Sequence, residues 1–308
     1  MPAFRVAVIG LGKIARDQHL PSIAADPDLT LAATVDPQAS AIGETPHFAS
    51  LEALLQRDLA IDAVAICTPP QVRRRVASEA LAAGLHVLLE KPPGASLAEI
   101  AELERQAAAS GVTLFASWHS RYAAGVEPAR LWLANRKVRR VDVVWREDVR
   151  HWHPGQTWIW TPGGLGVFDP AINALSIITC VLPRSMFVTS AELFFPENCD
   201  APIAATAQLT DSAGGVGTLD LNFLQTGTQT WDIRVETDDG VCRLSQGGAV
   251  LSLPGGDAVA ADDEYPKLYR RFVELLRDRR SDVDIAPMRL VADAFLLGRR
   301  HVVEAFIE

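Results

Sequence analysis

An aspartate and an asparagine lie four residues apart in the stretch GGLGVFDPAINAL, which runs from Gly163 to Leu175. If this stretch begins a helix, Asp169 and Asn173 share one face, because residues four apart are neighbours on a helix surface. An acid and an amide directed at one point can bind a hydroxyl group and assist proton transfer. The same spacing also fits an N-cap and a buried hydrogen bond, so the spacing alone leaves both interpretations open.

A second group of chemically useful side chains lies between residues 145 and 160, WREDVRHWHPGQTWIW, which holds four of the seven tryptophans. Aromatic faces pack on the apolar faces of sugar rings, and carboxylates and imidazoles bond to hydroxyl groups, so this mixture favours a small, neutral, polyhydroxylated ligand. Each tryptophan could instead pack in a core or an interface. The candidate substrate-binding residues are Glu147, Trp152 and His153, with His119 and Trp231 elsewhere in the chain.

The same segment also raises the possibility of a metal site. Glu147, His151 and His153 offer the carboxylate and imidazole ligands that zinc favours, and some alcohol dehydrogenases use zinc.

A glycine motif near the N-terminus indicates dinucleotide binding. Residues 10–15, GLGKIA, fit the pattern GxGxxA between a predicted strand and a predicted helix. Gly10 would form the tight turn, Gly12 would let the backbone approach a pyrophosphate, and Lys13 and Ile14 begin the helix whose N-terminus faces the phosphates. Asp36 follows Ala15 by 21 residues, which is close to the spacing expected for an acid that binds the ribose.

Asp36 also predicts which nucleotide is preferred. Its carboxylate can accept hydrogen bonds from both ribose hydroxyls of NAD and would repel the 2′-phosphate of NADP. Pro37 and Gln38 carry no positive charge, although Arg16 could reach the same place. We therefore expect NAD to be preferred, with NADP as a possible second cofactor.

Two further strands of the first half end on residues suited to a ligand site. Thr68 and Pro69 follow the third strand, where the prolines could hold a cofactor-binding loop or simply end the strand. Glu90 and Lys91 follow the fourth strand and precede two prolines. Ligands bind outside the carboxyl ends of the strands in a doubly wound sheet, so both pairs are candidates for the cofactor site.

The order of predicted elements indicates an α/β protein of two domains. Strands and helices alternate over the first 120 residues, which predicts a Rossmann-type, doubly wound parallel sheet over residues 1–120. Beyond it, several strands between Met186 and Leu253 follow one another without helices, and two closing helices are expected at Tyr265–Arg279 and Pro287–Phe306. Residues 121–308 should therefore form a C-terminal α/β domain with an open, mostly antiparallel sheet that binds substrate and mediates oligomerisation.

Composition limits the classes of partner. The net charge of −9 without a basic cluster argues against nucleic acid, since phosphate binding needs concentrated Lys and Arg. No apolar run approaches the ~20 residues of a membrane span, and the N-terminus lacks a cleavable signal pattern. The four cysteines show no metal-ligand spacing. We expect a cytoplasmic protein with reduced thiols.

The sequence EKP at residues 90–92, after a GxGxxA domain, resembles the glucose-fructose oxidoreductase / inositol dehydrogenase (Gfo/Idh/MocA) family over the whole chain. Longer strings are similar, more specifically, to bacterial dehydrogenases of D-galactose and L-arabinose; these strings are Gly10–Pro21, Glu90–Ala95, Trp118–Arg121, Trp152–Trp160, Gly163–Ile177 and Asp282–Phe295. The resemblance implies that Lys91 is catalytic, beside the nicotinamide and the substrate hydroxyl, and that no metal takes part. It also implies oxidation of an aldopyranose at C1 to a lactone, and a homodimer.

The chain departs from many members of that family at residue 173. They carry a histidine, the usual base, where this chain has Asn173, and an amide cannot accept a proton at neutral pH. The proton must then go to Lys91, to Asp169 or to the two as a coupled pair. We expect Lys91 to be the acid/base residue, with Asp169 binding and tuning it. A dehydrogenase of another sugar or cyclitol, and a nicotinamide-binding regulator without catalysis, remain as alternatives.

Overall fold

The structure is a computed structural model that describes residues 2–259 and 263–308. The chain forms two compact units. Unit 1 contains Met1–Trp118 and Tyr265–Ile285, and unit 2 contains His119–Glu264 and Ala286–Glu308. The boundary after Trp118 lies close to the expected boundary at residue 120, but the expected second domain of residues 121–308 includes the segment Tyr265–Ile285, which packs in unit 1.

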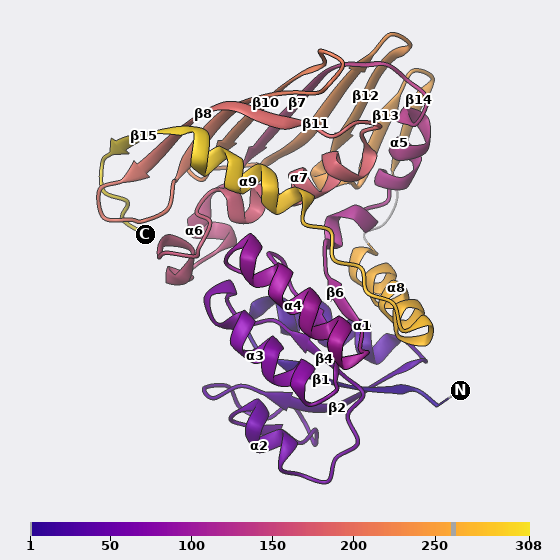
Figure 1. The fold of residues 1–308 in the computed structure, drawn as a ribbon. Helices are drawn as coiled ribbons and strands as arrows, with labels where there is room; N and C mark the ends of the chain where they lie inside the picture. The colour runs from indigo at the N-terminus through magenta and orange to yellow at the C-terminus, as the bar shows by residue number, and fades with distance from the viewer. Residues whose placement is uncertain (1, 260–262) are drawn as a thin grey trace. The chain divides into compact units, whose positions relative to one another are not determined.

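Unit 1 is built on a six-stranded, entirely parallel sheet with the strand order β3-β2-β1-β4-β5-β6 (Figure 1). This is the order of a Rossmann fold, in which the chain reverses its direction of winding next to β1. The two-residue strand β3 was not expected from the sequence. The strands are β1 (Phe4–Ile9), β2 (Leu29–Val35), β3 (His47–Phe48), β4 (Ala63–Ile66), β5 (His86–Leu89) and β6 (Leu114–Ala116).

Helix α4 of unit 1 begins and ends where the sequence provides caps. Ser96 accepts a hydrogen bond from the Glu99 N–H at the start of α4, and Gly111 ends that helix at φ +66°. The helices are η1 (Ala15–His19, a π-helical turn), α1 (Leu20–Ala25), α2 (Leu51–Leu55), α3 (Pro70–Ala82), α4 (Leu97–Ser110) and α8 (Glu264–Asp278).

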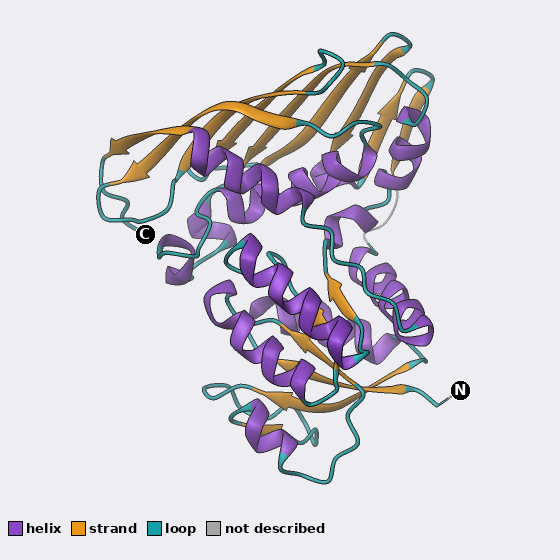
Figure 2. Cartoon of the chain, viewed as in Figure 1, coloured by secondary structure: helices purple, strands orange, loops and turns teal. Residues whose placement is uncertain are grey.

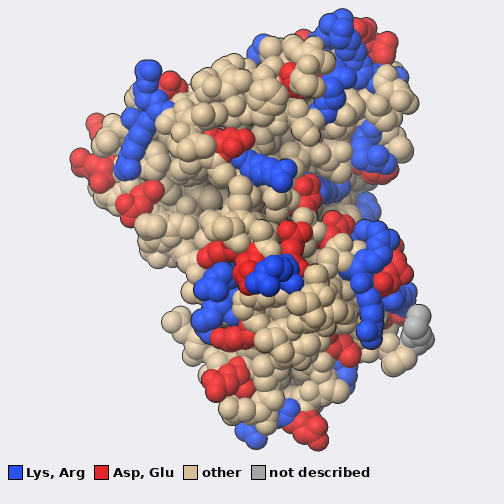
Figure 3. All heavy atoms as spheres, in the orientation of Figure 1, with Lys and Arg blue, Asp and Glu red and all other residues tan. Residues whose placement is uncertain are grey.

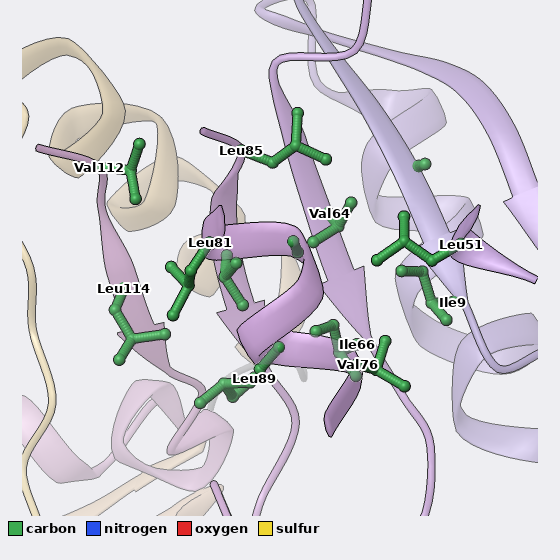
Figure 4. Close-up of a cluster of buried hydrophobic side chains, with 14 of the residues drawn as sticks. Ile9, Leu51, Val64, Ile66, Val76, Leu81, Leu85, Leu89, Val112 and Leu114 are labelled. Atoms are coloured by element: carbon green, nitrogen blue, oxygen red, sulfur yellow. The ribbon is translucent and has the colours of Figure 1, made fainter. Parts of the chain in front are cut away.

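One face of this sheet forms an apolar core with α2, α3 and α4 (Figure 4). Its strands are mostly apolar because both faces are covered. The labelled residues from the sheet are Ile9, Val64, Ile66, Leu89 and Leu114, and those from the helices include Leu51, Val76 and Leu81.

Helix α8 belongs to unit 1 because its apolar face packs against the other side of the sheet. Phe272 stacks on Phe115 of β6 at a ring-centroid distance of 6.0 Å, and Thr113 Oγ1 donates to the Leu275 carbonyl over 3.3 Å. Leu268, Tyr269 and Phe272 are fully buried. These contacts explain why a segment late in the sequence completes the first unit.

Unit 2 is built on a nine-stranded mixed sheet with the order β14-β13-β12-β11-β7-β10-β9-β8-β15. Most neighbours are antiparallel, as expected, and the parallel pairs are β7 with β10 and β8 with β15. The strands are β7 (Val138–Arg146), β8 (Phe187–Pro196), β9 (Ala204–Thr210), β10 (Val216–Asn222), β11 (Thr230–Thr237), β12 (Gly240–Ser245), β13 (Val250–Leu253), β14 (Gly256–Val259) and β15 (Gly298–Val303).

Helices cover one face of this sheet (Figure 2). The strands accordingly alternate buried and more exposed residues, as β7 does from Val141 to Arg146. The helical segments are η2 (His119–Tyr122), α5 (Val126–Leu133), α6 (Val149–Trp152), η3 (Thr157–Trp160), α7 (Phe168–Val181), η4 (Gln246–Gly248) and α9 (Ala286–Leu297).

The expected closing helix over Pro287–Phe306 was too long. Helix α9 ends at Leu297, and Gly298–Val303 form β15, paired in parallel with Ala191–Pro196 of β8. A continued helix and a paired strand would both satisfy the backbone groups of this segment. The segment forms a strand because β8 offers a free edge.

Candidate active site

The glycine turn after β1 is determined by its surroundings. Gly10 has φ +88°, which L-residues with side chains rarely adopt, and its N–H donates to the Val35 carbonyl over 2.8 Å. A Cβ at Gly10 would lie 3.0 Å from the Cys67 carbonyl carbon and 3.0 Å from the Thr68 nitrogen. Only glycine therefore allows β1 to turn this close to the end of β4.

Gly12 is different, because nothing in the protein requires it to be a glycine. A Cβ at this position would meet no atom within 4 Å, and its φ lies outside the left-handed region. The helix begins directly afterwards, with the side chains of Lys13 and Ile14 exposed and the Lys13 ammonium paired with Asp17. The open space over Gly12 fits a phosphate group resting on the backbone at the start of a helix.

Asp36 follows β2 and is bonded to the glycine turn. Its Oδ2 accepts from the Leu11 N–H over 2.8 Å, and its Oδ1 accepts from the N–H groups of Gln38 and Ala39 over 2.8 and 2.9 Å. Partial burial raises the pKa of the carboxyl group, but these three donors outweigh it and hold the pKa below its usual range. Asp36 is thus an anion at the same sheet edge as Gly10.

Thr68 and Pro69 link the end of β4 to the start of α3. Pro70 occupies the first position of α3, where the absent N–H is not needed, so the prolines mark the start of this helix. The buried guanidinium of Arg73 donates to the carbonyls of Thr68, Glu90 and Pro92. The loop after β4 and the EKP segment after β5 are therefore held together by one side chain.

Glu90 is buried, with an exposed fraction of 3%, and both of its oxygens are bonded. Oε1 accepts from the Tyr265 hydroxyl over 2.7 Å and lies 3.1 Å from His19 Nε2, and Oε2 accepts from the Lys91 N–H over 2.7 Å. Lys91 itself is half-buried and precedes a cis peptide to Pro92. The glutamate of EKP thus fixes the backbone of the lysine that follows it.

His19 completes this group from the helix after the glycine turn. Its Nδ1 lies 2.7 Å from the Tyr269 hydroxyl, and its ring is fully buried. Burial lowers the pKa of His19, but Cys67, Tyr269 and Glu90 around the ring outweigh it and hold the pKa well above its usual value. Burial raises the pKa of Tyr269 to about 12, so the phenol stays protonated.

Sequence reasoning does not reveal this buried support. The sequence favours a structural role for His19 and gives no sign that Tyr265, Tyr269 and Arg73 belong with it. Arg73 is the first of three consecutive arginines in QVRRR, which resembles an exposed helix face. Tyr265 and Tyr269 are four apart, which predicts a shared helix face but not the residues they contact.

Asp169 and Asn173 lie one turn apart on α7, in unit 2. The N-cap of α7 is Val167, which makes no side-chain capping bond, so Asp169 is not the N-cap. Asp169 is buried, with an exposed fraction of 2%, and Asn173 is half-buried. The N-cap is thus excluded, and the two residues share a helix face, as the catalytic interpretation requires; the catalytic pair itself stays a prediction.

The glycines before α7 are required by the packing of the chain. A Cβ at Gly164 would lie 2.2 Å from the Trp158 carbonyl oxygen, and one at Gly166 would lie 2.3 Å from the Pro202 carbonyl oxygen. Gly166 also has φ +55°. Together they allow the chain to turn tightly into α7, so they position Asp169 indirectly.

Four of the expected substrate-binding residues form one cluster in unit 2. Glu147 is buried, its Oε2 accepts from Trp231 Nε1 over 2.7 Å, and its Oε1 lies 3.0 Å from His153 Nε2. The ring of Trp152 lies 4.8 Å from that of Trp231 at a tilted angle. The carboxylate thus orients an indole and an imidazole around it, and two aromatic faces adjoin them.

The other residues of the Trp-rich segment support this cluster. Trp145 is buried and stacks on Trp231 at 5.8 Å, because the two residues are register partners on β7 and β11. His151 contacts the edge of Trp152. Within the described residues, no group of three or more His, Cys, Asp or Glu side chains has the geometry of a metal site.

His119 lies at the start of unit 2, in η2. Its Nδ1 lies 2.6 Å from Glu264 Oε2, and its side chain is mostly buried. Both residues belong to unit 2, so this contact joins the first residue of the unit to Glu264.

Comparison with known proteins identifies the family. Residues 4–117 match the sequence model of the Gfo/Idh/MocA oxidoreductase family, NAD-binding Rossmann fold. The whole chain is 46% identical to galactose 1-dehydrogenase of Pseudomonas fluorescens, with 100% of both chains covered. The chain belongs to the Gfo/Idh/MocA oxidoreductase family. It is accordingly an oxidoreductase with the NAD-binding Rossmann domain of that family.

Solved structures of relatives agree with this assignment. A crystal structure of a D-galactose-1-dehydrogenase protein from Rhizobium etli matches with a TM-score of 0.95 and 52% identity, over 100% of this chain and 99% of that one. GenD2 from gentamicin A biosynthesis, in complex with NAD, matches with a TM-score of 0.80 at 19% identity, over 96% and 94% of the two chains. The second likeness concerns the fold alone.

The surface of this family member carries mixed charges. On the face drawn in Figure 3, Lys and Arg side chains alternate with Asp and Glu, and no continuous basic field appears there. Among the described helices, none is long and apolar enough to cross a membrane.

Proposed function

We propose that this chain is an aldose 1-dehydrogenase that oxidises the C1 hydroxyl of an aldopyranose to the lactone, with NAD or NADP as the hydride acceptor. The observation that carries the proposal is similarity over the full length to two galactose 1-dehydrogenases, at 46% and 52% identity. D-Galactose and L-arabinose share their ring stereochemistry from C1 to C4 and differ at C5. A pocket that recognises the C2 to C4 hydroxyls accepts both sugars.

The residues at the carboxyl edge of the unit 1 sheet suit NAD. The open space at Gly12 and the helix that follows would receive the pyrophosphate, with Gly10, Lys13 and Ile14 shaping the turn. Asp36 would accept the ribose hydroxyls, and Thr68, Pro69 and Glu90 would line the remainder of the site. The bound nicotinamide supplies the hydride acceptor. Because Asp36 is anionic, NAD is preferred over NADP.

Replacing Asp36 by alanine tests the preference. Removing the carboxylate removes two acceptors for NAD and the repulsion of the 2′-phosphate. We expect the ratio of kcat/KM for NAD to that for NADP to fall by about 10-fold or more, which corresponds to roughly 1.4 kcal/mol. An unchanged ratio would show that another residue determines the preference.

The Glu147 cluster would bind the sugar. Trp152 and Trp231 offer aromatic faces, and His153 and His119 offer imidazole groups to hydroxyls. Glu147 would act mainly by orienting Trp231 and His153, because both of its oxygens already accept from them.

Lys91 would take the proton of the C1 hydroxyl, with Asp169 binding and tuning it. An unperturbed lysine has a pKa near 10.4, and a positively charged nicotinamide beside it lowers that value, since like charges disfavour the ammonium form. Asp169 opposes this effect. Asn173 can orient the hydroxyl but cannot accept its proton.

The decisive experiment measures NAD reduction at 340 nm with D-galactose, L-arabinose, D-glucose and myo-inositol. We expect turnover with the first two sugars, and a loss of about 10²-fold or more in kcat for Lys91→Met. Asp169→Ala and Asn173→Ala are measured alongside, and Lys137→Met, at an exposed position, serves as the matched control. Near-normal turnover of Lys91→Met would refute the assignment of the base. NAD binding without turnover on any compound would favour a non-catalytic regulator.

We further propose a cytoplasmic homodimer that pairs through the open face of the unit 2 sheet. That face carries paired charges such as Arg140 with Asp142 and Arg146 with Asp220, which suit a polar interface. Light scattering of the purified protein gives the oligomeric state, and a monomer at micromolar concentration would refute the proposed homodimer.

A further inference from the structure

His19 is a fully buried histidine whose two ring nitrogens both have partners within unit 1. Nε2 lies 3.1 Å from Glu90 Oε1, and Nδ1 lies 2.7 Å from the Tyr269 hydroxyl. Tyr265 meets the ring edge to face at a centroid distance of 5.1 Å. A buried imidazole held on both nitrogens has one orientation and one set of partners.

The backbone at His19 is also unusual. Ala15–His19 form a π-helical turn, which begins at the alanine of the GxGxxA motif and ends at the histidine. Such turns are rare and occur mostly as single turns at functional sites. Its last residue, His19, contacts Glu90, so the helix that follows the glycine turn is connected to the EKP segment.

The contacts of Glu90 show why a histidine is useful there. Glu90 is buried and directly precedes Lys91, whose N–H it accepts over 2.7 Å. A buried carboxylate needs a compensating charge or several donors. Tyr265 supplies a neutral donor to Oε1, and His19 is the basic side chain that bonds to the same oxygen.

We propose that His19 is a positioning residue of this enzyme: as an imidazolium it compensates the charge of Glu90, fixes the EKP backbone and keeps Lys91 able to accept a proton. This inference rests on the proposed role of Lys91 as the base. Without His19, Glu90 would be a less compensated anion next to Lys91 and would favour the ammonium form, which cannot act as a base.

The groups that face His19 come from three elements. Cys67 lies after β4, Glu90 lies after β5, and Tyr265 and Tyr269 lie on α8. Tyr269 is neutral over the working range because burial raises its pKa to about 12. Of the two other acidic groups at the ring, Cys67 and Glu90, Glu90 is the one that also accepts from the Lys91 N–H, so it is the anion that links His19 to Lys91.

The test is the pH profile of kcat/KM for the sugar in His19→Gln, which retains a hydrogen-bond donor but not the charge. We expect the acid limb of this profile to lie at higher pH in the variant than in the wild type. A shift of about one pH unit lowers kcat/KM below the limb by about 10-fold. The KM for NAD should change little. Adding Glu90→Gln to His19→Gln removes the negative charge that the imidazolium had balanced and should return the limb toward its wild-type position, which a merely structural role would not do.

Two further variants keep the test independent of folding. Tyr269→Phe retains the buried ring and removes only the hydroxyl oxygen that lies beside His19 Nδ1. It should therefore shift the acid limb of the pH profile in the same direction as His19→Gln, but by a smaller amount. His86→Gln is the matched control, since His86 accepts from the Thr113 N–H and lies at the opposite end of β5 from Glu90. An unchanged acid limb in His19→Gln, or no return in the double variant, would overturn the proposal.

A measurement without turnover separates this inference from the proposed function. Nitrogen-15 NMR of the imidazoles, assigned with His19→Gln, should show His19 protonated at pH 7.5 in the wild-type protein. If the wild-type protein fails to reduce NAD with every sugar tested, the proposed function fails. A protonated His19 would still support the charge compensation of Glu90. A neutral His19 at pH 7.5 overturns the inference even in an active enzyme.

Discussion

Replacing each of the two glycines of the GxGxxA motif by alanine should change a different property of the protein. Gly10→Ala places a Cβ 3.0 Å from backbone atoms of Cys67 and Thr68 and forces alanine into φ +88°. Gly12→Ala places a Cβ in space that no protein atom occupies within 4 Å, at an ordinary φ. The first change should therefore affect folding and the second should affect nucleotide binding.

The expected magnitudes follow from these contacts. For Gly10→Ala, the left-handed conformation costs about 1–2 kcal/mol and the backbone shift about 1–3 kcal/mol, so the unfolding free energy should fall by roughly 2–5 kcal/mol. For Gly12→Ala, the unfolding free energy should change by no more than about 0.5 kcal/mol. If phosphate rests on the Gly12 backbone, the KM for NAD should rise by at least about 10-fold, or roughly 1.4 kcal/mol.

The assay combines thermal unfolding without nucleotide and steady-state kinetics with varied NAD. We expect Tm of Gly10→Ala to fall by roughly 5–15 °C and that of Gly12→Ala to stay within about 2 °C of the wild type. The KM for the sugar should be nearly unchanged in Gly12→Ala, which makes it an internal control. A Gly12→Ala protein with a normal KM for NAD, or with a strongly lowered Tm, would refute the reasoning.

Three further predictions concern other parts of the site. Asp36→Asn should lower the unfolding free energy only above about pH 4. The lowered pKa of Asp36 contributes stability that is present above the pKa of the unfolded chain, near 3.9, and is lost as the pH falls through the pKa of the folded protein. Denaturation curves from pH 2 to 7 check this, and a difference between variant and wild type that does not change with pH would contradict it. Glu147→Ala leaves the partly buried donors of Trp231 and His153 unpaired and should cost about 1–3 kcal/mol and raise the sugar KM, whereas Glu147→Gln, the isosteric control, should retain most of the stability; chemical unfolding and kinetics compare them, and equal losses would show that shape is unimportant. Gly164→Ala should displace the start of α7 and lower both Tm and kcat, since its Cβ would lie 2.2 Å from a carbonyl oxygen; a normal kcat would show that Asp169 tolerates the shift.

Features that depend on neighbouring residues in the chain were predictable. The glycine turn at Gly10, the cap of α4 at Ser96 and the alternation of strand and helix before residue 118 all agree with the structure. Each depends on backbone dihedral angles or on hydrogen bonds that span only a few residues. The family resemblance extended the prediction of the fold to the whole chain, because the matching strings of residues occur along its full length.

The limits of such reasoning appear where distant segments meet. Gly298–Val303 was expected to be helical and instead pairs with β8, about a hundred residues earlier. Segment Tyr265–Ile285 was expected in the second domain and packs in the first. In both cases a free sheet edge or an uncovered sheet face, formed elsewhere in the chain, decided the outcome, and no local pattern encodes such a partner.

The sequence by itself determined the nucleotide-binding turn, the chemical types at residues 90, 91, 147, 169 and 173, and the exclusion of Asn173 as a base, since an amide has no basic site at neutral pH. Only the tertiary structure decided that Glu90 is bonded to His19 and Tyr265, that Glu147 joins Trp231 to His153, and that Asp169 is buried in the first turn of α7 without capping it. The reason is physical: residue type determines what a group can donate or accept, but burial and the approach of groups many residues away determine which of those bonds it makes and which charge it carries.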